Sequence, residues 1–142
     1  MSRKRRRTSL ETDMHNFLSA SPGDNRFAAI HEGMLKSRKW QELSPTAKNL
    51  FVVAAAHAQT ADNYRSLFSY KQSEGIADNE LPGNGYFILT RQYLEIYGFT
   101  GGHSSRYFAE LIEGGFIECI HNNQHRKKSN LYRLSAKWKE PG

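Results

Sequence analysis

The chain of 142 residues has only one cysteine, Cys119, and no apolar stretch long enough to cross a membrane. A single cysteine cannot form an intrachain disulfide, which fits a reducing compartment. The longest mainly apolar stretch, residues 50–58, is about half of the roughly 20 residues that a membrane-spanning helix needs. No signal-type apolar segment follows the basic N-terminus. The sequence therefore predicts a cytoplasmic protein that does not associate with membranes.

Motifs of the common enzyme and metal sites are also missing. The sequence has neither a G-x-x-x-x-G-K phosphate loop nor a G-x-S-x-G nucleophile motif. Cys119, His121 and His125 are close in sequence, but no fourth zinc ligand accompanies them, so we interpret Cys119 as a small strand residue. We expect no enzymatic activity, no bound metal and no cofactor.

The net charge of +6 is distributed unevenly along the chain. Residues 1–7 hold five bases and residues 119–139 hold six, both without an acid, whereas residues 8–118 hold nine bases and thirteen acids. Clusters of bases bind polyanions, and nucleic acid is the first candidate because each neutralised phosphate releases condensed counterions. The two clusters consist of Arg3, Lys4, Arg5, Arg6 and Arg7, and of Arg126, Lys127, Lys128, Arg133, Lys137 and Lys139.

The first half of the chain predicts one firm helix. Residues 1–24 lack a sustained helical or strand period, so we expect a disordered basic arm. Residues 27–30 predict a short strand, and residues 34–39 a helical turn that places Trp40 against the core. Ser44 and Pro45 predict a helix start, followed by apolar residues at steps of three and four. Residues 59–85 predict a long polar connection with a short strand at 66–70.

The second half has sharper signals. Residues 86–89 predict a strand, and Thr90 caps a helix that runs to Tyr97. Gly98 ends this helix, a glycine turn follows, and a second helix covers residues 103–113. Residues 116–120 and 131–134 predict a hairpin whose polar, basic tip is residues 122–130.

This order of elements is typical of a winged helix-turn-helix. We therefore predict an α+β fold that is mainly helical with a small antiparallel β-hairpin wing, over residues 25–139. The second helix would enter the major groove of DNA, where Arg106 could pair with guanine and Glu110 with a cytosine amine. The wing and the arm would bind phosphates, with the arm alternatively entering a narrow minor groove. The predicted contacts are His103, Ser104, Ser105, Arg106, Tyr107 and Glu110 in the helix; Asn123, Gln124, Arg126, Lys127, Lys128, Ser129, Asn130, Arg133 and Lys137 in the wing and its flank; and Arg3, Lys4, Arg5, Arg6 and Arg7 in the arm.

Residues 90–117 resemble the winged helix-turn-helix superfamily, on the signals Leu89-Thr90, Leu94, Gly98, Leu111 and Gly115-Phe116-Ile117. Residues 27–134 are also similar to the N-terminal family of plasmid replication initiators from Gram-positive bacteria and to small DNA-processing proteins of conjugative elements. The residues that carry this second resemblance are Met34-Leu35, Trp40, 43–51, 86–89 and 110–117.

The resemblance implies a sequence-specific, double-stranded DNA-binding accessory protein of a mobile genetic element. It would bind a transfer origin of a plasmid and aid relaxosome assembly in conjugation, with a relaxase or another mobile-element protein as partner. A transcriptional repressor or a replication-initiation protein with the same fold is an alternative, as is a protein-interaction module without DNA binding. Whether the protein acts as a monomer or a dimer on DNA stays open.

One enzymatic alternative follows from the second helix. Residues 103–106 match the H-x-x-R box of tyrosine recombinases, and Tyr132 lies downstream as a nucleophile. The same four residues are already accounted for by a helix that reads DNA, so we favour the non-enzymatic interpretation.

Overall fold

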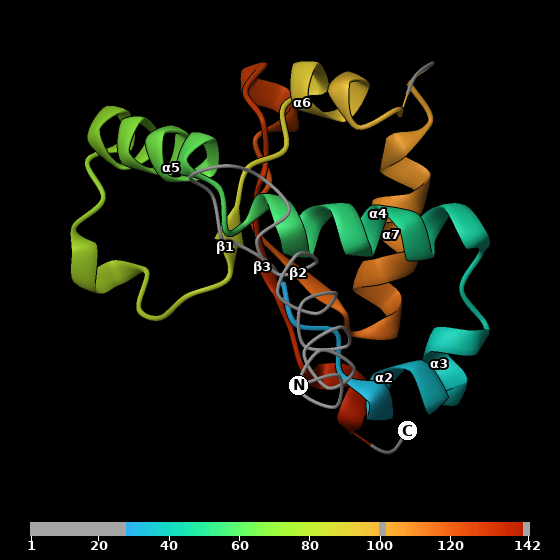
Figure 1. Ribbon diagram of the computed structural model, residues 1–142. Helices are drawn as coiled ribbons and strands as arrows, with labels where there is room; N and C mark the ends of the chain where they lie inside the picture. Colours follow the sequence, from blue (N-terminus) through green and yellow to red (C-terminus); the bar gives the residue numbers. More distant parts are fainter. Residues whose placement is uncertain (1–27, 100–101, 141–142) are drawn as a thin grey trace, which may run out of the picture.

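A computed structural model describes residues 28–99 and 102–140, which form an α+β fold. Its described part contains six α-helices and one antiparallel sheet of three strands in the order β1-β3-β2 (Figure 1). The expected basic arm, with Arg3, Lys4, Arg5, Arg6 and Arg7, lies outside the described residues. The helices are α2 (Glu32–Lys36), α3 (Arg38–Gln41), α4 (Pro45–His57), α5 (Ala61–Glu74), α6 (Arg91–Ile96) and α7 (Ser104–Gly114); the strands are β1 (Tyr86–Phe87), β2 (Ile117–His121) and β3 (Leu131–Leu134).

Hydroxyl side chains fix where several helices begin. Ser44 accepts a hydrogen bond from the backbone N–H of Ala47, and Thr90 accepts one from Tyr93, so both predicted helix starts are confirmed. Thr60 caps α5 in the same way. These caps satisfy N–H groups that have no partner within their own helix.

The main hydrophobic core lies between one face of the sheet and the helices α4 and α7. Trp40, Phe51 and Phe116 meet edge to face there, with ring centroids 5.6–6.0 Å apart. The Phe108 ring of α7 stacks on Tyr132 of β3 with centroids 4.6 Å apart. This packing fixes the orientation of α7 relative to the sheet.

The predicted connection over residues 59–85, with its strand at 66–70, is wrong, because most of it is the helix α5. Thr60 begins the helix and Gly75, in the left-handed region with φ of 65°, ends it. The helix is mostly polar, and only a narrow stripe that includes Asn63 and Tyr70 is buried, so it lacks the broad apolar face that predicts a helix. Figure 1 shows α5 on the opposite side of the sheet from α4 and α7.

A second, smaller core lies beneath α5. Tyr70 of α5, Tyr86 of β1 and Leu131 of β3 are buried together there with Leu81 and Ile88. Successive residues of a strand face opposite sides, so Phe87 and Tyr132 belong to the main core while their neighbours Tyr86 and Leu131 belong to this one. The sheet is therefore covered by helices on both faces.

Asn63 joins α5 to the outer edge of β1. Its side-chain amide donates to the Tyr86 carbonyl at 3.0 Å, and its side-chain oxygen accepts from the Ile88 N–H at 3.0 Å. These are the backbone groups that a fourth strand would otherwise pair. Asn63 is fully buried and also reaches the Ala58 carbonyl at 3.3 Å.

Other predictions differ from the structure in their bounds. The predicted strand at 27–30 is not present over residues 28–30, and the helical turn predicted at 34–39 is divided between α2 and α3. Trp40 is buried as expected. The strand predicted at 86–89 is confined to Tyr86 and Phe87, although Ile88 and Leu89 are buried. No helix in the described ranges is long and apolar enough to cross a membrane.

Replacing Asn63 with alanine should lower the free energy of unfolding by about 3 kcal/mol, because buried backbone groups lose their partner. Chemical denaturation would measure the change. Asn79→Ala, at an exposed position, is the matched control and should change stability by less than about 0.5 kcal/mol. Equal stability of the two variants would contradict the role given to Asn63.

Candidate nucleic-acid interface

The helices α6 and α7 are joined by a short segment with glycines at both ends. The Gly98 and Gly102 backbones have φ of 94° and 75°, which other residues rarely adopt. The Phe99 N–H donates to the Leu94 carbonyl at 2.8 Å and closes the end of α6. Residues 100–101 between them are outside the described part. The two helices that flank the predicted glycine turn are present, and the turn itself is described only at Phe99 and Gly102.

Several side chains at the beginning of α7 are exposed. His103, Ser105 and Arg106 are exposed, whereas Ser104 is half-buried and Tyr107 packs partly against the main core. Arg106 forms no ion pair with any described residue, and the first turn of α7 carries no acid. This turn therefore presents a guanidinium, an imidazole and a hydroxyl to the solvent.

Glu110 is bound within the protein, so its carboxylate is engaged in this structure, and its predicted contact with a cytosine amine stays a prediction. Its carboxylate accepts from the Ser44 N–H at 3.0 Å and from the Ser44 hydroxyl at 2.8 Å. Ser44 caps α4, so Glu110 ties α7 to the beginning of that helix. Glu110 therefore has hydrogen-bond partners within the protein.

The hairpin tip is held by a buried amide. Asn123 is 3% exposed, and its Nδ2 donates to the Tyr70 hydroxyl at 2.9 Å and to the Ser129 carbonyl at 3.1 Å. The Tyr70 hydroxyl also pairs with Nδ1 of His121 at 2.9 Å. Asn130 accepts from the Asn123 N–H at 2.6 Å and donates to the Tyr132 hydroxyl. Both side chains are therefore engaged inside the hairpin, and their predicted contacts with DNA stay predictions.

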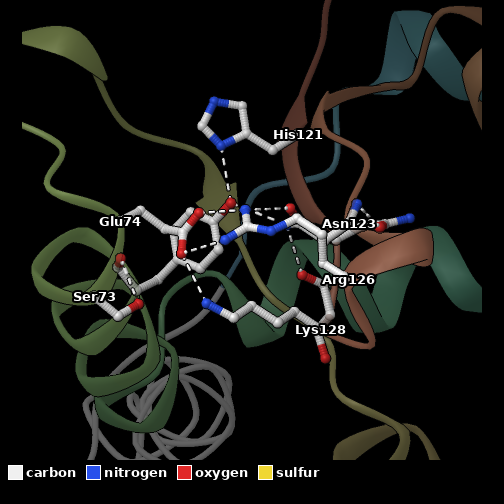
Figure 2. Close-up of polar contacts among 9 residues, drawn as sticks. Ser73, Glu74, His121, Asn123, Arg126 and Lys128 are labelled. Atoms are coloured by element: carbon white, nitrogen blue, oxygen red, sulfur yellow. Dashed lines mark hydrogen bonds and ion pairs between the residues drawn. The ribbon is translucent and has the colours of Figure 1, made fainter.

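Two bases of the tip are bound to Glu74 at the end of α5 (Figure 2). The Arg126 guanidinium donates to both carboxylate oxygens, to Oε2 at 2.9 Å, and Lys128 Nζ donates to Oε2 at 2.7 Å. The hydrogen bond from Arg126, followed by that from Lys128, lowers the pKa of Glu74 to about 2. The Arg126 and Lys128 side chains remain 51% and 42% exposed, whereas Glu74 is 12% exposed. The carboxylate thus lies beneath the two cations.

The remaining predicted wing residues occupy different environments. Lys127 and Gln124 are exposed, and Lys127 forms no ion pair within the described ranges. The Arg133 guanidinium lies over the Tyr86 ring, 4.9 Å from its centroid, and Lys137 pairs with Glu118 at 3.4 Å. Ser129 is half-buried. Lys127 is the wing base most open to a ligand.

Tyr70, Glu74 and the structural role of His121 were not predicted from the sequence, because no helix was expected between residues 59 and 75. Thr60 as a cap and Gly75 as a stop were the signals that could have predicted α5. The structure does not group Cys119, His121 and His125 as metal ligands, and no group of three such ligands occurs among the residues it describes. Burial raises the pKa of the Cys119 thiol, as suits a strand residue.

The pKa of Glu74 should lie well below its ordinary value of 4.5, at about 2. A carboxyl whose pKa is lowered by folding stabilises the folded state above its ordinary value of 4.5, and that contribution is lost as the pH falls toward about 2. Carboxyl-carbon NMR of the labelled protein would give the midpoint. In Arg126→Gln the midpoint should move upward, and an unchanged midpoint would contradict the ion pair.

Comparisons with known proteins give no match, whether with protein-family models, with curated proteins or with solved structures. The functional interpretation therefore depends on the geometry of α7 and the hairpin.

Proposed function

We propose that the protein binds double-stranded DNA as a winged helix-turn-helix. The observation that carries the proposal is the exposed, acid-free first turn of α7, which follows a glycine turn and shares one end of the molecule with the hairpin tip (Figure 1). In this assignment α6 and α7 are the helix-turn-helix, and the β2–β3 hairpin is the wing. An α-helix fits the major groove, and a hairpin beside it reaches the neighbouring backbone.

Arg106 is the residue of α7 best suited to read a base. Its guanidinium is exposed and makes no ion pair with any described residue, so no ion pair of the described part has to break before it binds a ligand. A guanidinium can donate two parallel hydrogen bonds to O6 and N7 of guanine. His103 and Ser105 lie just before it, and either can donate to a phosphate or a base edge.

The wing supports binding through charge. Arg126, Lys127 and Lys128 lie together at its tip, and Glu74 neutralises only one of these three charges. Contacts to phosphate position a protein on DNA without reading its sequence. We therefore assign affinity chiefly to the wing and sequence preference to α7.

The biological process within this proposal comes from the sequence resemblance alone. It is the binding of a transfer origin and the assembly of a relaxosome on a mobile element, with a relaxase as partner. A repressor or a replication initiator would use the same interface, and footprinting on DNA surrounding the gene would separate them by whether a transfer origin, a promoter or a replication origin is protected.

A protein-interaction module is the competing function, and one observation favours it. Tyr64 and Phe68, one turn apart on α5, are 69% and 63% exposed. Exposed aromatic side chains that lie together are common at protein interfaces. This alternative predicts no binding to duplex DNA, and a Tyr64→Ser, Phe68→Ser double variant would then lose the partner.

Duplex binding should weaken steeply with salt. About five phosphate contacts imply that the logarithm of the binding constant falls with the logarithm of salt concentration at a slope of about −4.5. Fluorescence anisotropy of a labelled duplex at several salt concentrations would measure it. A slope near zero, or no binding at low salt, would contradict the proposed function.

A variant of α7 should lose sequence preference, whereas a variant of the hairpin should lose affinity for all duplexes. Arg106→Ala should flatten the sequence preference obtained by selection from a random duplex pool, with a loss of about 1–3 kcal/mol on the preferred site. Lys127→Ala should weaken preferred and unrelated duplexes by the same factor. If both variants behave alike in the selection, the division between reading helix and wing is wrong.

A further inference from the structure

The contact between Glu74 and the hairpin tip leaves several hydrogen-bond donors unused. A guanidinium has five N–H groups and an ammonium has three. Arg126 uses two on Glu74 and one on the Asn123 side-chain oxygen, at 3.3 Å, while Lys128 uses one on Glu74. Within the described ranges, two donors of each side chain therefore stay without a partner. Both basic groups are about half exposed, so these donors can reach a ligand.

The charge of this cluster suits a single monoanion. One carboxylate and two cations leave a net charge of +1, and one backbone phosphate would neutralise it. The carboxylate keeps the two cations close together, although they would otherwise repel each other. Figure 2 shows Arg126 and Lys128 reaching toward Glu74 from the hairpin side, so one acid orients both.

A second contact from α5 holds the same tip without using charge. The Tyr70 hydroxyl accepts from buried Asn123, and Asn123 Nδ2 also donates to the Ser129 carbonyl across the tip. Tyr70 lies one helical turn before Glu74, and both face the hairpin. The tip is thus fixed at its base by Tyr70 and at its surface by Glu74.

We propose that Arg126 and Lys128, held on Glu74, form a binding site for one phosphate of the DNA backbone, and that Glu74 and Tyr70 are its positioning residues. This inference rests on the proposed DNA binding and adds to it that an acid on α5 strengthens binding. Side chains that are already ordered lose less freedom when a ligand binds. Simple charge repulsion between Glu74 and DNA gives the opposite expectation.

The test compares three variants of the full chain on one labelled duplex. Glu74→Gln removes the ion pairs with Arg126 and Lys128 together with one negative charge. Asp78→Asn is the charge-matched control, because the Asp78 side chain is fully exposed and, among the described residues, forms an ion pair with Lys71 alone, at 3.7 Å. Tyr70→Phe loosens the tip without changing charge. Thermal unfolding is measured first, so that binding is compared at a temperature where all variants are folded.

Glu74→Gln should bind about fivefold more weakly than Asp78→Asn, since two side chains lose their order. Tyr70→Phe should weaken binding in the same direction, and amide hydrogen exchange over residues 123–130 should accelerate in both Glu74→Gln and Tyr70→Phe but not in Asp78→Asn. Lys128→Gln should make the salt slope shallower by about 0.9, as expected for one lost phosphate.

Two failures can be told apart. If the wild-type protein binds the duplex but Glu74→Gln binds as tightly as Asp78→Asn, or more tightly, the phosphate site on Glu74 is wrong while the proposed function stands. If the wild-type protein binds no duplex at low salt, both fall together.

Discussion

The side-chain amide of Asn63 fixes the position of α5, and the hairpin tip of the candidate interface is held by α5. By bonding the open edge of β1, the amide fixes α5 across the second face of the sheet. Tyr70 and Glu74 follow at seven and eleven residues along the same helical stripe, so both are carried to the hairpin. One face of one helix thus protects a sheet edge, fills a small core and holds the hairpin tip.

Acids near the interface are used to support it. Glu110 binds Ser44 and fixes α7 on α4, Glu74 gathers two bases of the tip, and Glu118 pairs with Lys137. An acidic side chain held by internal donors repels a phosphate less than an unpaired one. This explains how a body with more acids than bases can present a positive surface at the hairpin and at the beginning of α7.

Helix caps and glycines predicted where several helices begin and end. The contacts between residues far apart in the sequence could not be predicted from such local signals. Ser44, Thr90 and Gly98 act on neighbouring backbone groups, so the starts of α4 and α6 and the end of α6 could be predicted. The helix α5 was missed because its buried stripe is short and its partner, the second sheet face, forms only in the folded chain. Glu110 and Ser44 are 66 residues apart, and no periodicity reveals such a pair.

The most direct test of the account is an NMR titration of the labelled full chain with duplex DNA. The account predicts the largest changes in backbone amide shifts at His103–Arg106 and Arg126–Lys128, with smaller changes along α5 near Glu74. Changes confined to the exposed Tyr64 and Phe68 face of α5, or no change at low salt, would contradict it.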